Sequence, residues 1–167
     1  MQQCFICVVY FLTDFTKKIY CILHAIKASI VATNVQQLLK SHQLRLTDMR
    51  VKVLDLFLSR AEALSQNDLE QQLGKVDRIT LYRTLRSFEE QGLIHKAMDG
   101  TDKQKYALCQ HDCGQGVHHD HHAHFHCDSC GKTICVDDIA APIIAPPPGF
   151  SVTATHLVMR GQCDQCN

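Results

Sequence analysis

The sequence predicts an α+β protein, in which a winged helix-turn-helix unit precedes a small α/β unit. Three observations support this prediction: helical hydrophobic stripes recur between residues 35 and 91, two short strand-like runs follow, and two Cys-x-x-Cys pairs lie in the C-terminal part. Short helices followed by a two-stranded hairpin are typical of the winged variant of the helix-turn-helix. A chain of 167 residues is long enough for two such units, and a metal ion would stabilise the smaller one.

The composition limits the classes of function. Seventeen basic and seventeen acidic residues cancel, so the net charge alone gives no support for nucleic-acid binding. The charge is uneven, because residues 36–96 carry ten Lys or Arg against eight Asp or Glu, whereas residues 104–167 carry three basic residues against six aspartates. The ten cysteines and eleven histidines, without a recognisable secretory signal, lead us to expect a reducing cytoplasm and metal thiolates.

Residues 1–33 have a separate interpretation. The segment Phe5–Leu12 is apolar but only eight residues long, whereas a transmembrane helix needs about twenty. It also lacks the basic start and small-residue cleavage site of a signal peptide. We expect residues 1–33 to be an extension outside the native fold, with translation starting near Val31, and we expect no membrane partner. A membrane-associating or packing helix is the alternative.

The first three helices are predicted by their caps and by the spacing of their apolar residues. The first begins near Val35, and the second follows Thr47, an N-cap residue. The third opens at Ser65, where Asp68 completes a capping box, and ends at Gly74. Residues spaced by three and four form the buried stripes. They are Val35, Leu38, Leu39, Val51, Leu54, Phe57, Leu58, Leu69 and Leu73.

The fourth helix carries a local basic surface. It is predicted to run from Asp77, its N-cap, to Gln91, with Gly92 as the C-terminal stop, and it buries Leu81, Leu85 and Phe88. Its other face gathers side chains suited to phosphates and base edges, namely Arg78, Thr80, Tyr82, Arg83 and Arg86. Three arginines without an interleaved acid are uncommon on a helix that merely faces solvent, so we interpret this face as a DNA-binding surface. A solvated helix face is the alternative.

Strand-like runs complete both units. Leu93–Lys96 and Lys105–Cys109, joined through the turn Asp99-Gly100, predict the wing. Three further strands are predicted in the C-terminal part, at Ala123–His126, Thr133–Val136 and Val152–Met159. Pro142 and the prolines at 146–148 exclude a long helix before the last strand.

Two cysteine pairs predict one structural zinc site. Cys127-x-x-Cys130 and Cys163-x-x-Cys166 can each direct two sulfurs at one ion, giving a closed shell of four thiolates at about 2.3 Å. Strands must bring the pairs together, because 32 residues separate them. Two disulfides or a thioredoxin-like redox motif are the alternatives, although a redox motif needs no second pair.

A second, regulatory metal site is predicted between the two units. Six histidines precede Cys127, and they are His118, His119, His121, His122, His124 and His126. His95 and Cys109 end the wing strands, and Cys135 follows the first cysteine pair. Joined by His124 or His122, they offer two thiolates and two imidazoles, a tetrahedral set that favours zinc over manganese. Such an ion would fix the orientation of the two units and favour a DNA-competent arrangement. A nonspecific metal-binding tract beside buried apolar cysteines and a surface histidine is the alternative.

The motifs, in this order, resemble the ferric uptake regulator superfamily over about residues 35–166. The matching motifs are Thr47-x-x-Arg50, Ile79-Thr80-Leu81-Tyr82-Arg83-Thr84-Leu85, His122-x-His124-x-x-Cys127-x-x-Cys130-Gly131-Lys132 and the final Cys-x-x-Cys. Cys109, in Tyr106-Ala107-Leu108-Cys109, and Cys135 resemble the zinc uptake regulator branch. The resemblance implies a homodimer that represses zinc-uptake genes when zinc is plentiful, with Arg50 among its DNA-binding residues. It further implies a winged-helix DNA-binding domain at 34–109, a hinge at 110–116 and an α/β dimerisation domain at 117–167.

The chain departs from the family pattern at several positions. Iron-sensing members usually place a histidine where this chain has Ala61-Glu62-Ala63, and carboxylates where it has Cys109 and Cys135. The acid-bearing helix after the first cysteine pair is replaced by Asp137-Asp138-Ile139 and prolines, which weakens the case for a third metal site. His156 lies one residue from a family metal position.

The sequence thus predicts a zinc-dependent repressor that binds double-stranded operator DNA, with one structural and at least one regulatory zinc ion per subunit. An iron or peroxide sensor of the same superfamily is the nearest alternative, and a zinc-handling chaperone without DNA binding is a further one. No His-x-Glu precedes a cysteine pair, as a zinc deaminase requires, so we expect no enzyme and no small organic substrate.

Overall fold

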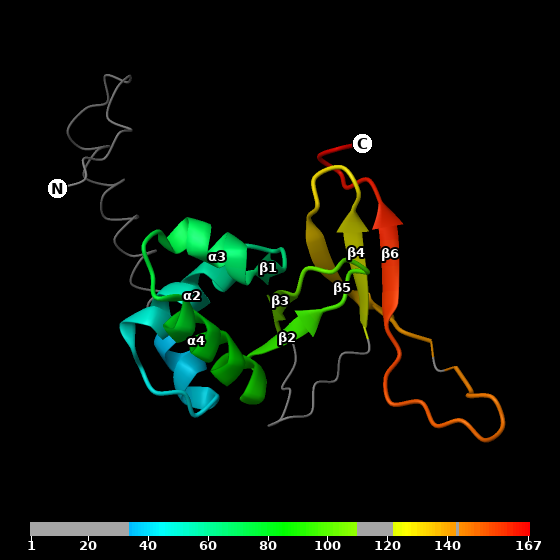
Figure 1. Ribbon diagram of the computed structural model, residues 1–167, viewed down its shortest axis with the longest axis horizontal. Helices are drawn as coiled ribbons and strands as arrows, with labels where there is room; N and C mark the ends of the chain where they lie inside the picture. Colours follow the sequence, from blue (N-terminus) through cyan, green and yellow to red (C-terminus); the bar gives the residue numbers. More distant parts are fainter. Residues whose placement is uncertain (1–33, 110–121, 143) are drawn as a thin grey trace, which may run out of the picture.

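The computed structural model describes residues 34–109, 122–142 and 144–167. Helices lie on one side of the molecule and a three-stranded sheet on the other, with the wing strands between them (Figure 1). The expected extension 1–33, the hinge 110–116 and His118, His119 and His121 of the histidine tract lie outside the described residues. No helix in the described part of the chain is long and apolar enough to cross a membrane.

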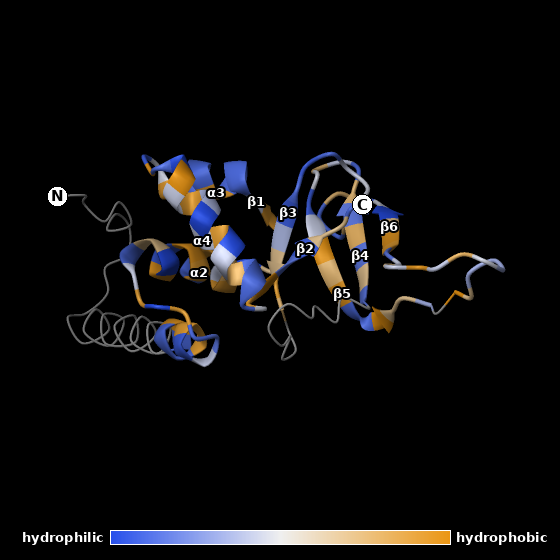
Figure 2. Ribbon diagram, turned by 60° about the horizontal axis from the view of Figure 1, so that its bottom comes forward, coloured by the Kyte–Doolittle hydropathy of each residue, from blue (hydrophilic) through white to orange (hydrophobic). Residues whose placement is uncertain are grey.

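The helices follow the caps expected from the sequence. Residues 34–41 are helical and are followed by α2 (Asp48–Ser59), α3 (Gln66–Leu73) and α4 (Arg78–Glu90). The Thr47 side chain accepts from the backbone N–H of Arg50, and the capping box of Ser65 and Asp68 is formed. The Asp77 carboxylate accepts from the backbone N–H of Thr80 at 2.8 Å. In Figure 2 the helices alternate between hydrophobic and hydrophilic positions, as expected when one side of each is buried.

One apolar core joins the helices to the wing. Its largest fully buried side chains include Phe57 of α2, Leu69 of α3 and Phe88 of α4. Leu93 and Ile94 extend this core from the end of α4 into the wing. Each such side chain contributes about 1.5–3 kcal/mol through removal of its apolar surface from water, so the wing is tied to α4 by the same burial that holds the helices.

The wing is a hairpin with a short third strand. β2 (Ile94–Ala97) pairs antiparallel with β3 (Lys105–Leu108), which also pairs with β1 (Leu64–Ser65). The two predicted wing strands are confirmed, and no strand end differs from its predicted position by more than one residue. β1 was not predicted, because two residues are too few to show an alternating pattern.

The second sheet has the order β5-β4-β6. β4 (His122–Cys127) pairs antiparallel with β5 (Thr133–Ala140) and parallel with β6 (Leu157–Gly161). The expectation that the last strand begins at Val152 was wrong, because pairing with β4 starts only at Leu157. β5 and β6 lie on opposite sides of β4, so the proline-bearing segment that joins them has to cross past β4. The described residues of this unit contain no helix, so the helical component of the expected α/β unit is not found among them.

The wing packs directly against the second sheet. Three small buried residues, Ala63, Ala97 and Ala107, form the contact surface, and Cys135 of β5 packs on them. The backbone N–H of Ala63 also donates to the carbonyl oxygen of Thr133 at 2.8 Å. Alanine side chains allow two backbones to approach closely, so polar side chains at the edges of this contact can meet across it.

Candidate metal centres and nucleic-acid surface

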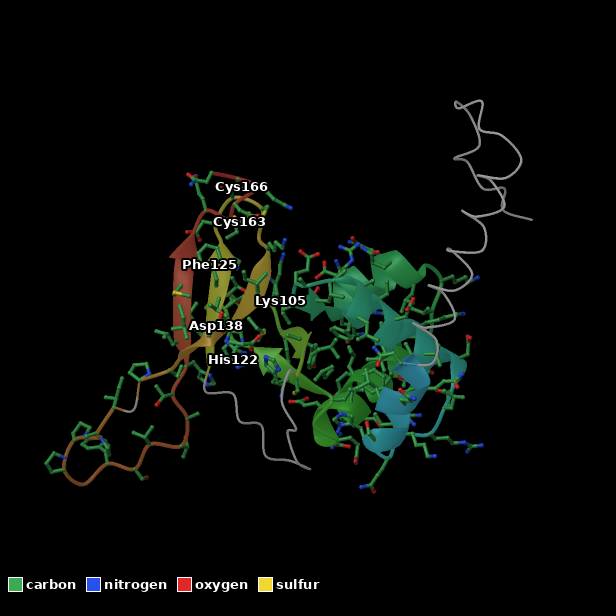
Figure 3. The ribbon with its side chains drawn as sticks, turned by 180° about the vertical axis from the view of Figure 1, so that it is seen from behind. Lys105, His122, Phe125, Asp138, Cys163 and Cys166 are labelled. Atoms are coloured by element: carbon green, nitrogen blue, oxygen red, sulfur yellow. The ribbon has the colours of Figure 1, made fainter. Side chains whose placement is uncertain are left out.

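Strand β4 carries residues of both candidate metal centres. Cys163 and Cys166 lie at one end of the second sheet and His122 at the other, with Lys105 on the side that faces the helices (Figure 3). Alternation along β4 places His124 and His126 on one face. Their cross-strand partners on β5 are Cys135 and Thr133, respectively.

The four cysteines of the two pairs converge as the sequence predicted. Their four sulfur atoms all lie within 4.8 Å of one another, and they belong to Cys127, Cys130, Cys163 and Cys166. The Cys130 and Cys163 sulfurs are 3.8 Å apart. Four sulfurs bound to one zinc ion at about 2.3 Å would be separated by about 3.8 Å, so the spacing fits a shared tetrahedral ion.

The backbone around this group preorganises the first cysteine pair. The Gly131 N–H donates to the Cys127 carbonyl at 2.9 Å, and the Cys127 N–H donates to the Lys132 carbonyl at 2.8 Å. Gly131 has φ of 74°, a left-handed conformation that costs a glycine little. The tight turn therefore directs two sulfurs to the same side of the chain.

Electrostatics in this group favour a bound cation. Backbone hydrogen bonds from Cys130 and Cys163 lower the pKa of the Cys127 thiol to about 6. The neighbouring sulfurs of Cys163 and Cys130 raise the pKa of Cys166 to about 12. Four crowded thiols cannot all ionise without a positive charge among them, and a divalent metal ion supplies that charge.

A second group spans the wing and the sheet. Ligand atoms of His95, His122, His124 and Cys135 lie within 4.8 Å of one another. The Nε2 atom of His95 is 3.4 Å from Nε2 of His124 and 3.4 Å from Sγ of Cys135. On a tetrahedral zinc ion, two imidazole nitrogens would lie about 3.3 Å apart and a nitrogen and a sulfur about 3.5 Å apart. We refer to these four residues as the bridging cluster.

Burial prepares the bridging cluster for a metal ion. Burial, together with the nearby His122 and His156, lowers the pKa of His124 to about 4, which leaves its imidazole neutral at physiological pH. Neutral imidazole is the form that binds metals. No described residue hydrogen-bonds to the buried Nδ1 atom of His124.

Cys109 lies beside the bridging cluster rather than within it. Its sulfur is 3.6 Å from Nδ1 of His95, whereas Cys135 and His124 approach Nε2 of the same ring. The structure therefore assembles three imidazoles and one thiolate, instead of the expected two and two. In this arrangement the Cys109 sulfur can accept a hydrogen bond from Nδ1–H of His95. That bond would leave Nε2 as the nitrogen available to a metal.

The predicted DNA-binding residues other than Arg50 lie on the exposed side of α4. Tyr82 is 51% exposed and Arg83 is exposed, while Arg78 and Arg86 form surface ion pairs with Glu70 and Glu90. The Thr80 hydroxyl donates to the N-cap carboxylate of Asp77.

Two features of this surface were not anticipated. Ile79, which is 60% exposed, adds an apolar side chain to this face of α4. In the sequence, an isoleucine among the polar residues of this face was the signal that could have pointed to it. Arg50 donates to the Ser87 hydroxyl and to the Arg45 carbonyl, each at 2.9 Å, so it braces α2 against α4. Its contact with DNA stays a prediction.

The ferric uptake regulator family model matches residues 41–146, more than half of the chain. The chain belongs to the ferric uptake regulator family. A ferric uptake regulation protein of Neisseria meningitidis serogroup C is 33% identical over 146 residues, which cover 80% of this chain and 93% of that relative. A ferric uptake regulation protein of Staphylococcus epidermidis is 29% identical over 136 residues, which cover 78% of this chain and 91% of that relative. Family members are transcription regulators and not enzymes, so this regulator is a metal-responsive, DNA-binding protein.

Solved structures share this fold. A zinc uptake regulator complexed with zinc and DNA is 25% identical, with a TM-score of 0.54 over 83% of this regulator and 93% of that chain. The ferric uptake regulator of Vibrio cholerae is 21% identical, with a TM-score of 0.50 over 76% of this regulator and 98% of that chain. The architecture of a winged helix followed by a small sheet domain is therefore that of the family.

The four-cysteine group yields the first prediction. Replacing Cys163 with serine should remove one zinc ion per subunit and unfold the second sheet, because apparent binding energies of structural zinc in small domains are about 10–16 kcal/mol. Zinc content and thermal unfolding measure both effects. Cys109→Ser is the matched control and should keep this ion. Full zinc content in the Cys163 variant would contradict the assignment.

The position of Cys109 yields the second prediction. Cys135→Ala should abolish metal binding at the bridging cluster, whereas Cys109→Ala should weaken it about 10- to 100-fold, as expected for a residue that only orients a ligand. Competition with a chelating dye measures both affinities in protein whose four-cysteine ion is retained. Equal and complete loss in the two variants would instead make Cys109 a ligand.

Proposed function

We propose that this regulator is a zinc-dependent repressor that binds operator DNA as a homodimer and senses zinc at the bridging cluster. The observation that carries the proposal is the convergence of His95, from the wing, with His122, His124 and Cys135, from the second sheet, within 4.8 Å. A site whose ligands come from two units has its highest affinity for a metal ion when the two units are oriented so that all the ligands meet. Metal binding then favours that orientation.

Zinc is supported by the chemistry of the donors. Neutral imidazoles and a thiolate are soft ligands, and the bridging cluster contains no carboxylate. Manganese and magnesium prefer oxygen ligands in octahedral arrangements, which this cluster does not offer. The donor spacing also matches a tetrahedral ion, the geometry that zinc adopts most often.

The bridging cluster lies close to the DNA-binding helix along the chain. β2, which carries His95, begins at Ile94, and α4 ends at Glu90. Lys96 of β2 pairs with Glu89 of α4 at 2.8 Å, and the Leu93 N–H donates to the Phe88 carbonyl at 2.9 Å. A bound ion would supply a fixed positive centre for its ligands. Because the connection between α4 and β2 is short and well packed, a change in the position of His95 would change the position of α4.

The four-cysteine group has a different role in this proposal. All its ligands belong to the second sheet and its flanking turns, so an ion there stabilises that unit without affecting the orientation of the wing. We assign it as the structural zinc site, one ion per subunit. The sheet unit, 117–167, is the proposed dimerisation domain, and 34–109 is the proposed DNA-binding domain. Two-fold symmetry would place paired α4 helices on a palindromic operator in the cytoplasm.

Iron is the second candidate for the sensed metal. Relatives named ferric uptake regulation proteins are 29–33% identical to this chain, and the fold would be the same with either metal. The departure is local: Cys135 presents a thiolate to the bridging cluster. Non-haem ferrous sites typically combine histidines with a carboxylate, whereas histidines with a thiolate at tetrahedral spacing are typical of zinc, which is why zinc is the preferred proposal.

The metal preference gives the third prediction. Operator binding, measured against buffered free zinc and separately against ferrous iron without oxygen, should respond at far lower concentrations of zinc. The operator can be selected from random duplexes with the zinc-loaded protein. A stronger response to iron would establish the second candidate, and the absence of any sequence-specific DNA binding would establish a zinc-handling chaperone.

The α4 surface gives the fourth prediction. Arg83→Ala should weaken operator binding by about 1–3 kcal/mol, the discrimination that one bidentate base contact provides. Arg160→Ala, at an exposed arginine of the second sheet that pairs with Asp128, is the matched control and should bind normally. Unchanged affinity in the Arg83 variant at fixed salt would remove Arg83 from the interface.

A further inference from the structure

We propose that Thr133, together with Asp99 and Lys105, forms a metal-independent connection between the wing and the second sheet, and that this connection preorganises the bridging cluster. The inference deepens the proposed function, on which it rests, by assigning positioning residues to the metal-sensing site. These residues lie outside both metal-binding groups, and in the sequence they have only structural places, Asp99 in a turn and the other two at the starts of strands.

Thr133 is contacted by the wing through its hydroxyl. Its Oγ1 donates to Oδ2 of Asp99 at 2.6 Å and accepts from Nζ of Lys105 at 2.8 Å. The Lys105 ammonium also pairs with Asp99 at 2.9 Å and donates to the Gly131 carbonyl at 2.7 Å. His126 completes the group, since its Nδ1 lies 3.1 Å from Oγ1 of Thr133 and 3.3 Å from Oδ2 of Asp99.

The group is buried and fully satisfied. Thr133 has 0% exposure, and the side chains of Asp99 and Lys105 are 1% and 9% exposed. Burial raises the pKa of the Asp99 carboxyl, but hydrogen bonds from Thr101, Thr133 and Lys105 outweigh it and hold that pKa well below its usual value. A buried ion pair is tolerated only with such complete hydrogen bonding, so separating the wing from Thr133 would leave charges poorly solvated.

Thr133 also hydrogen-bonds to a second segment of the N-terminal unit that contains the helices and the wing. Its carbonyl accepts from the backbone N–H of Ala63, which precedes β1, while its hydroxyl faces the β2–β3 hairpin. Two segments that are distant in sequence therefore meet on one residue of β5. These hydrogen bonds involve no metal ligand, so they persist whether or not the bridging cluster holds an ion.

The connection and the bridging cluster are neighbours on the same two surfaces. On the second sheet, the pair His126 and Thr133 is the next same-face rung after His124 and Cys135. On the wing, Lys105 opposes Ala97, one same-face rung from His95 and its partner Ala107. Successive rungs on one face are about 7 Å apart, so a movement that opens one contact opens the other.

This proximity predicts a thermodynamic coupling. Zinc binds the bridging cluster only when its ligands are assembled, so the apparent dissociation constant equals the intrinsic constant divided by the assembled fraction. The hydroxyl of Thr133 raises that fraction without contacting the ion. Removing the hydroxyl should therefore weaken zinc binding at the bridging cluster while leaving the four-cysteine site occupied.

The test is the variant Thr133→Val, which keeps the side-chain volume and leaves Lys105 paired with Asp99. Zinc affinity at the bridging cluster is measured without DNA, by competition with a chelating dye, in protein that retains its four-cysteine ion. We expect it to fall about tenfold, because losing the hydrogen bonds of this hydroxyl to two charged groups should lower the assembled fraction from most of the molecules to about a tenth of them. Thr133→Ser should restore normal affinity, and Thr153→Val, at an exposed threonine of the same unit, is the matched control.

A second measurement uses the unaltered protein and does not depend on how a variant folds. With the bridging cluster emptied by a mild chelator and the four-cysteine ion retained, the amide of Ala63 should stay protected from hydrogen exchange. An amide that exchanges freely under those conditions overturns the proposal, as does a zinc affinity in Thr133→Val within twofold of the original. Neither readout uses DNA, so failure of the repressor assignment would appear separately, as operator binding that ignores zinc.

Discussion

The close contact of the wing with the β4–β5 ladder is the constraint on which the rest of this structure depends. Small side chains at Ala63, Ala97 and Ala107 let the two surfaces approach, and this approach brings His95 to Cys135 and Lys105 to Thr133. Larger residues at the alanine positions would hold the surfaces apart and separate both pairs. The bridging cluster, the proposed sensing site, is thus a consequence of packing as much as of ligand chemistry.

The two metal-binding groups differ in what they connect. The four cysteines come from turns of one sheet, so an ion there lowers the free energy of a single folding unit. The bridging cluster takes His95 from one unit and three ligands from another, so its ion acts on their relative orientation. This difference in how the ligands are distributed over the fold is the basis for proposing a permanent ion in one group and a variable ion in the other.

Charge is organised locally, although the chain as a whole is neutral. The arginines of α4 are exposed to solvent, whereas the ion pair of Lys105 and Asp99 is buried between the units. Within the bridging cluster, burial lowers the pKa of His124 to about 4, so that its imidazole is neutral at physiological pH. A metal ion bound at the unprotonated nitrogen of that ring would displace no proton from it, and the proposed DNA-binding surface of α4 shares no residue with the bridging cluster.

Local patterns determined the parts of this protein that neighbouring residues control. Thr47, Ser65 and Asp77 cap the helices as predicted, because a cap needs only a side chain and an amide three residues away. The spacing within each cysteine pair likewise directs two sulfurs to one point. The position of Cys109 behind His95, the start of β6 at Leu157 and the burial of Thr133 between two units were decided by the tertiary structure. Each depends on the register between strands far apart in sequence, which no local spacing encodes.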